Sequence, residues 1–342
     1  MNRNQLLTLL SELVACHAPP GEEREIEAVI WREFEATHPP TGSTTGLKVW
    51  QDGATNIYAH LPGQGPKVMI CAHKDELGMI ITHIQPDGRL KVTNIGGALP
   101  WKYGEGPVDV LADDGSAIRA ILSVGSVHTR SGPMAELKSS RALTWDLVTL
   151  FTGLAPDQLA AKGVHAGSRA VVARERKAIQ RLGEYIASYA LDDRMGLVAI
   201  VAGLKEMAQT TRTEERPDCY FVATHGEEIG MLGAVRAAQV LQPEICIAID
   251  TSPVTHDTPT ALDPRPSSGM ARRPIITKLT ATPSCVWPMS WALGRSRPSI
   301  LGPVLTPGGS SRPAWPGAPS PLASPATIRT ATRLLTLTHW SM

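Results

Sequence analysis

Apolar residues recur at helical spacing near the start of the chain. The first stripe consists of Leu6, Leu7, Leu9, Leu10 and Leu13, and a second one consists of Ile26, Val29, Ile30 and Phe34. Pro19-Pro20-Gly21 interrupts the pattern between them, and the acidic positions 22, 23 and 25 follow, where negative charge favours a helix N-terminus. Residues 4–36 therefore predict two helices.

Short apolar runs after residue 46 predict strands. The runs at 47–51 and 56–60 flank an Asp52-Gly53 turn, and the mostly apolar runs at 67–72, 219–223 and 245–249 are typical of strands that are covered on both faces. Helical spacing at 193–207 and 230–240 separates the later runs. This alternation predicts an α/β fold with a mainly parallel sheet flanked by helices.

The segment 78–173 has a different texture. Its runs alternate at period 2 and are separated by Gly, Pro and Asp turns such as Gly96-Gly97 and Asp114-Gly115. We interpret it as a small all-β insert. The main domain would then be discontinuous and consist of residues 1–77 and 174–262.

The last part of the chain follows neither period. Residues 264–342 contain no Asp or Glu but nine Lys or Arg, and the segment is rich in proline. We interpret 263–342 as an aberrant tail that is not natively folded, because such a composition is unlike that of a packed domain.

Composition narrows the class of protein. A net charge of +1 over 342 residues gives no reason to expect nucleic acid or an anionic membrane as a partner. Five scattered cysteines without a CxxC pair argue against a disulfide framework and a thiolate metal site. With no signal-peptide pattern and no long apolar span, we expect a cytoplasmic protein.

Candidate chemistry lies at the ends of the predicted elements. His73 and Asp75 follow one apolar run, Glu227-Glu228 follow another, and Asp250 closes a third. The fourth group, Asp192 with its neighbour Asp193, opens a helix. Ligands of open α/β sheets bind at the carboxyl ends of the strands, so we expect these side chains to converge.

Each group also has an ordinary structural explanation when it is taken alone. A histidine at a strand end is more often structural than ligating, and Asp192 could simply cap its helix. Glu227-Glu228 could form a solvated turn, and a salt bridge could satisfy Asp250. Together, however, nitrogen and oxygen donors without thiolates suit Zn²⁺, Co²⁺ or Mn²⁺.

The motifs His73-Lys-Asp75-Glu-Leu-Gly, Leu-Asp192-Asp-Arg-Met-Gly, Gly-Glu227-Glu228-Ile-Gly and Ile-Asp250 resemble those of the M42 metallo-aminopeptidases, also called glutamyl aminopeptidases or cellulase M. The resemblance runs from about residue 5 to about residue 260. It implies a zinc-peptidase-like fold, a PDZ-like dimerisation insert at 78–173 and a dodecamer that degrades short peptides from their amino ends.

The resemblance also implies roles for the residues. His73, Asp192, Glu228 and Asp250 would bind two divalent metals, with zinc or cobalt expected and manganese accepted, and Asp192 would bridge them. Glu227 would be the general base that acts on a water between the metals. Asp75 would orient the site around His73.

The chain departs from the family pattern beyond Asp250. The family places another metal-binding histidine near its C-terminus, whereas only His256 and His339 follow here and neither has a matching neighbourhood. We attribute this to a reading-frame change near residues 260–275 of the chain, and resequencing of the gene would test it.

The sequence leaves alternative functions open. A catalytically inactive subunit that retains its assembly insert is one alternative, and a related two-metal carboxypeptidase or amidohydrolase is another. The cellulase label would need aromatic sugar platforms and metal-free carboxylates.

Overall fold

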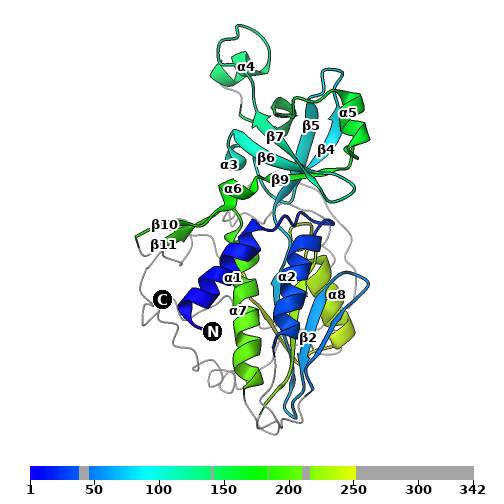
Figure 1. The fold of residues 1–342 in the computed structure, drawn as a ribbon, viewed down its shortest axis with the longest axis vertical. Coiled ribbons are helices and arrows are strands. Elements are labelled where there is room, and N and C mark those ends of the chain that lie inside the picture. The colour runs from blue at the N-terminus through cyan, green and yellow to red at the C-terminus, as the bar shows by residue number, and fades with distance from the viewer. Residues whose placement is uncertain (38–45, 140–141, 184, 210–215, 252–342) are drawn as a thin grey trace, which may run out of the picture.

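The computed structural model describes residues 1–37, 46–139, 142–183, 185–209 and 216–251. It consists of a sheet-and-helix body with a β-barrel set on one end of it (Figure 1). The tail assigned to 263–342 lies outside the described residues.

The body contains a mixed five-stranded sheet in the order β1-β2-β12-β3-β13. Its strands are β1 Lys48–Gln51, β2 Ile57–Leu61, β3 Lys67–His73, β12 Asp218–Thr224 and β13 Ile245–Ala248. β12 and β13 both pair with β3 in parallel, whereas β2 is antiparallel to β1 and β12. The prediction of a mainly parallel sheet therefore holds only for the three strands around β3, because the tight turn after β1 forces an antiparallel hairpin.

Helices cover both faces of this sheet, as its apolar strands predicted. On one face α1 (Arg3–Ala15), α2 (Arg24–Glu35) and α7 (Leu191–Ala208) form the main core with the sheet (Figure 1). On the other face α8 (Leu232–Leu241) packs on a smaller cluster that includes Tyr58, Met69 and Val222. Successive side chains of β3 alternate between these two cores, with Val68 on the α7 side and Met69 on the α8 side.

The inserted unit is a closed antiparallel barrel in the order β4-β5-β8-β7-β6-β9. Its strands are β4 Gly78–Ile84, β5 Leu90–Ile95, β6 Gly106–Leu111, β7 Ala117–Ser123, β8 Thr149–Phe151 and β9 Arg169–Val172. All of them fall within 78–173. The segment is not all-β, because it also contains the helices α3 (Pro100–Tyr103), α4 (Pro133–Ser139) and α5 (Pro156–Ala161) and a 3₁₀ turn at Trp145–Leu147. Its domain status and its PDZ-like character stay predictions.

A short connection leads from the barrel back to the body through α6 (Arg174–Lys177) and the hairpin β10 (Gln180–Leu182) and β11 (Tyr185–Ala187). The four cysteines in the described part of the chain are buried and free. No helix within the described ranges is both long and apolar enough to cross a membrane.

Candidate metal centre

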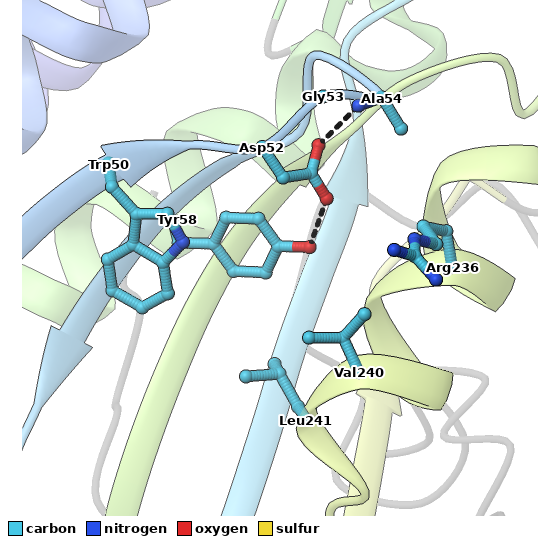
Figure 2. A pocket seen from close by; sticks show the side chains of 8 residues that line it. All are labelled: Trp50, Asp52, Gly53, Ala54, Tyr58, Arg236, Val240 and Leu241. Atoms are coloured by element: carbon cyan, nitrogen blue, oxygen red, sulfur yellow. Dashed lines mark hydrogen bonds between the residues drawn. The ribbon is translucent and has the colours of Figure 1, made fainter.

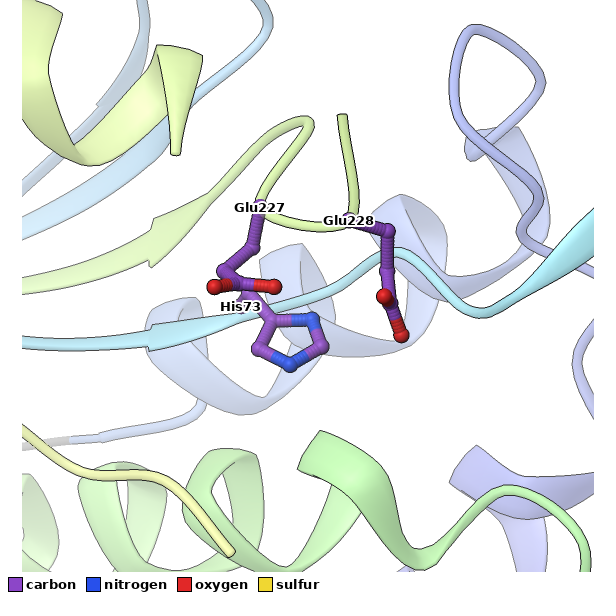
Figure 3. Close-up of side chains that lie close together, drawn as sticks. All are labelled: His73, Glu227 and Glu228. Carbon is purple, nitrogen blue, oxygen red and sulfur yellow. The ribbon is translucent and has the colours of Figure 1, made fainter. Parts of the chain in front are cut away.

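Four separate elements bring the candidate side chains to one edge of the sheet. His73 ends β3, and Thr224 at the end of β12 lies beside it in the parallel register. The loop after β12 carries Glu227 and Glu228, and both carboxylates project towards the side on which the His73 ring lies (Figure 3). The expected convergence of the strand ends is therefore present in the structure.

Two overlapping groups of possible ligand atoms share His73. The first is His73 with Glu227 and Glu228, and the second is His73 with Asp192 and Asp250. Within each group the ligand atoms lie within 4.8 Å of one another. The structure therefore places four carboxylates around one imidazole.

The His73 ring is held on both sides. Nδ1 lies 3.1 Å from the backbone carbonyl oxygen of Asp75, and Nε2 lies 3.0 Å from Oδ1 of Asp192. Burial favours the neutral ring, but the carboxylates of Asp192 and Asp75 raise the pKa of His73 well above its usual value. Nε2, which faces Asp192, is therefore the ring nitrogen that a cation between the two side chains would contact.

Asp75 holds the acidic loop as well as the imidazole. Its carboxylate is fully buried, and its two oxygens accept the backbone N–H groups of Glu227 (2.9 Å) and Glu228 (3.0 Å). Burial alone would raise the pKa of Asp75, but His73 and these two N–H groups keep it below its usual value. The carboxylate therefore stays ionised and fixes the backbone from which both glutamates project.

The crowded carboxylates have the His73 ring beside them but no Lys or Arg partner within the described ranges. None of the described Lys and Arg residues forms an ion pair with Asp192, Glu227, Glu228 or Asp250. Burial, with the carboxylates of Asp192 and Glu227 adding to it, raises the pKa of Glu228 to about 8. The pKa of Glu227 is raised for similar reasons. Such groups become fully ionised only when protons leave or cations arrive.

The donor set fits a divalent metal, since one imidazole and several carboxylates offer ligand atoms within 4.8 Å of one another. Imidazole and carboxylate donors without thiolate suit zinc, cobalt and manganese alike.

The structure bears on the ordinary structural explanations for Asp192, for the Glu227-Glu228 pair and for Asp250. Asp192 is not the cap of α7, because Oδ1 of its neighbour Asp193 accepts the N–H of Gly196 at 3.0 Å. Glu227 and Glu228 are half-buried and thus not a solvated turn. Asp250 is exposed and lies beyond the end of β13, so the cost of burying its charge gives no argument for metal binding.

Sequence reasoning missed several charged groups beside the centre. Asp193 is fully buried, burial raises its pKa to about 8, and its Oδ2 has no hydrogen-bond partner in the described part of the chain. Lys74, also fully buried, contacts the carboxylates of Glu23 and Glu27, and Glu23 in turn lies 2.6 Å from Nδ1 of His225. Only the run of polar residues after each strand hinted at such a network.

A cavity of about 340 Å³ lies away from these side chains, between β1, β2 and α8 (Figure 2). Trp50, Tyr58, Arg236 and Leu241 line it together with Asp52. The Asp52 carboxylate already accepts the Tyr58 hydroxyl at 2.7 Å and the N–H of Ala54 at 2.9 Å. The Asp52 carboxylate is therefore already hydrogen-bonded within the protein. We place the catalytic chemistry at the carboxylates around His73 instead.

Comparison with known proteins shows which family the sequence matches. Residues 55–272, which include every candidate residue of the centre, match the M42 glutamyl aminopeptidase family. The chain belongs to this family. Among curated proteins, it is 31% identical over 204 residues to the lysyl aminopeptidase of Pyrococcus furiosus, a match that covers 59% of this chain and 55% of that protein.

Solved structures agree with the M42 assignment. An aminopeptidase from the archaeon Desulfurococcus kamchatkensis is 28% identical with a TM-score of 0.62, and the match covers 76% of this chain and 66% of that one. The TET1 peptidase of Pyrococcus horikoshii, which can assemble into a tetrahedron or a large octahedral shell, is 25% identical with a TM-score of 0.58 over 74% of this chain and 72% of its own. The M42 chain described here thus spans little more than half of the lysyl aminopeptidase and about two thirds of these structures.

Proposed function

We propose that the protein is a metal-dependent aminopeptidase that removes the N-terminal residue from short peptides with two divalent ions. The observation that supports this most is the gathering of carboxylates from three elements around His73, with no Lys or Arg among the described residues to neutralise them. Membership of the M42 family is consistent with this chemistry.

The ligand roles follow from how the side chains are placed. His73 would bind one ion through Nε2, since Nδ1 faces the carbonyl of Asp75. Asp192 would bridge the two ions, and Glu228 and Asp250 would each complete one ion's coordination. We favour zinc or cobalt, while manganese suits the same donors. The ions, when bound, would polarise the scissile carbonyl and make a water more acidic.

Glu227 would carry the proton. Its raised pKa places its carboxyl closer to neutral pH, which suits a group that accepts a proton and later donates it. It would take a proton from the attacking water as the C–O bond forms and give one to the leaving amine as the peptide bond breaks. Asp75 would keep Glu227 in position through the loop backbone.

The test uses the full chain, purified and then supplied with zinc, cobalt or manganese. We expect hydrolysis of aminoacyl-nitroanilides and of short peptides, no hydrolysis of N-acetylated peptides, and loss of turnover with a chelator. C-terminal amidation should have little effect, which separates an aminopeptidase from a carboxypeptidase. Turnover that survives chelation, or equal cleavage of acetylated peptides, would contradict the proposal.

One observation favours a second candidate, an inactive subunit of the same family. Both groups of ligand atoms in the described part of the chain depend on the same imidazole. Metal analysis decides between the two: two tightly bound ions per chain favour the enzyme, and zero or one favours the inactive subunit.

We further propose a cytoplasmic homo-oligomer built from dimers through the barrel, with a dodecamer as the complete form. The TET1 peptidase, whose fold this chain shares, supports such an assembly. Light scattering of the purified chain tests it, and a monomer at all accessible concentrations would contradict it.

A further inference from the structure

A buried side-chain amide outside the metal centre forms a hydrogen bond with the backbone of the loop that carries Glu227 and Glu228. We propose that Asn56, at the end of the β1–β2 turn, is a positioning residue for this loop. The inference rests on the proposed function only for its effect on metal binding and catalysis.

Asn56 is fully buried and joins three separate parts of the chain. Its Oδ1 accepts the backbone N–H of His225 at 2.9 Å, and its Nδ2 donates to the carbonyl of Gly233 at 3.1 Å and to Oδ2 of Asp52 at 3.1 Å. His225 lies two residues before Glu227, and Gly233 lies in the first turn of α8. One side chain therefore fastens both ends of the acidic loop.

The turn that presents Asn56 is itself firmly constrained. Thr55 adopts a left-handed conformation with φ of 61°, which is rare for a β-branched residue. Oδ1 of Asp52 accepts the N–H groups of Ala54 and Asn56, each at 2.9 Å, and thereby holds this backbone. Such conformations persist only where surrounding bonds over-determine them, and they cluster at functional sites.

The side-chain amide of Asn56 lies so close to α8 that a side chain at Gly233 would not fit. A Cβ atom on Gly233 would lie 2.3 Å from Oδ1 of Asn56 and 2.4 Å from the backbone nitrogen of His225. Alanine is the better helix former, so helix propensity alone does not explain a glycine at this place in α8. Close approach of the helix to Asn56 and the loop does explain it.

Asp75 and Asn56 act on the loop from different points. Asp75 holds the N–H groups of Glu227 and Glu228 directly, whereas Asn56 holds the backbone on which those residues depend. The Glu23 carboxylate adds a third attachment through the ring of His225. Asn56 touches none of the proposed ligands, so it positions them without taking part in the chemistry.

The test compares four variants of the full chain. Asn56→Asp keeps the size but replaces the donor with an acceptor that faces the Gly233 carbonyl and Asp52. Gly233→Ala pushes on the same contact from α8. Asn2→Asp makes the same chemical change at an exposed helix cap, and Ile200→Val weakens the fully buried core of α7 without touching the loop.

The first measurement is hydrogen exchange in the metal-free chain, followed by mass spectrometry on peptides that span residues 222–231. We expect exchange of the 225–228 amides to be about 10-fold faster in Asn56→Asp and Gly233→Ala, as the loss of one buried hydrogen bond predicts. The two control variants should match the parent. Loop exchange in Asn56→Asp no faster than in Ile200→Val overturns the inference.

The second measurement is the affinity for Zn²⁺ and Co²⁺ by calorimetry, with the visible absorption spectrum of the cobalt form. We expect affinity to fall about 10-fold to 100-fold in Asn56→Asp, as is typical when support of metal ligands is lost, and kcat to fall while KM stays within about twofold. Unchanged affinity, spectrum and kcat overturn the inference. A parent chain that binds no metal would refute the proposed function, and hydrogen exchange would still decide the role of Asn56.

Discussion

Glu227 and Glu228 are neighbours in the chain, yet we assign them different tasks. Both lie near Asp75, but Asp250 acts on Glu227, whereas Glu228 packs against the Gly96 turn at the end of β5. Two adjacent carboxylates at one strand end can serve as a metal ligand and a base, but the residues alone do not say which is which. Only the family resemblance ordered them.

Substitution separates the two tasks. Glu227→Gln should lower kcat by about 100-fold to 10,000-fold, because the amide cannot accept the proton of the attacking water, and it should leave metal content unchanged. Glu228→Gln should instead weaken metal binding, because an amide oxygen is a poorer ligand than a carboxylate. Nitroanilide turnover and metal analysis of both variants measure this. Equal loss of metal in the two variants would contradict the assignment.

Residues that support the centre were harder to predict than residues that form it. The motif residues follow apolar runs, so their chemistry and their common sheet edge could be predicted together. Asn56, His225 and Glu23 meet only in three dimensions, since their partners are up to 202 residues away in sequence. The role of Asp193 was not predictable, because two adjacent aspartates do not reveal which one accepts the N–H of Gly196.

Among the elements, the barrel and the body are joined by contacts of a buried carboxylate as well as by the chain itself. Asp109 on β6 lies 3.0 Å from the ring of His17, just after α1, and accepts the backbone N–H of Arg174 at 3.3 Å. Within the barrel Arg119 donates to Asp109 at 2.7 Å, and within the body Lys177 contacts His17 and Glu76. The contacts across this junction therefore depend on the Asp109 carboxylate.

This junction predicts a loss of stability in acid. Burial alone would raise the pKa of Asp109, but contacts with His17 and Arg119 lower it to about 2. A lowered carboxyl pKa contributes stability above the unfolded value near 4, here about 2 kcal/mol, and that contribution disappears as pH falls from about 4 to about 2. Urea unfolding at pH 5, 4 and 3 measures it.

Asp109→Asn should be less stable than the parent at pH 5, and the difference should shrink towards pH 3. The matched control is Asp87→Asn, at an exposed carboxylate beside Arg89. A difference that is constant over this range, or the same pH dependence in the control, would show that the Asp109 charge does not stabilise the junction.

Element boundaries show where sequence patterns suffice. The strands around β3 were predicted to within one residue because continuous apolar runs end at charged residues. The helix predicted from Gly230 begins instead at Leu232, because Gly230 and Met231 adopt positive φ before it. Barrel closure was not predictable, since pairing of β9 with β4 joins segments about 90 residues apart and leaves no local pattern.

At the scale of the whole molecule, the body, the barrel and the centre depend on one another. Glu76 lies next to Asp75 in sequence, and its carboxylate binds Lys177 of α6 and the N–H of Ala18. The hydrogen-bonded groups at the barrel junction are thus continuous with the residue that holds His73 and the acidic loop.

The number of imidazole ligands at the centre determines how tightly the chain binds each of the two proposed ions. One imidazole nitrogen can ligate only one ion, so the other ion would rely on carboxylates within the described part of the chain. We therefore expect two unequal affinities for Zn²⁺, different by more than about 10-fold, a gap within the range that changes around metal ligands produce. Titration calorimetry with Zn²⁺, on the chain stripped of metal by a chelator, measures both affinities.

The same titration tests the tail. His339→Ala should change neither affinity, because no family motif surrounds that histidine. Two equally tight ions, or the loss of one ion on removing the His339 imidazole, would mean that the tail supplies the missing nitrogen and that the proposed frame change is wrong.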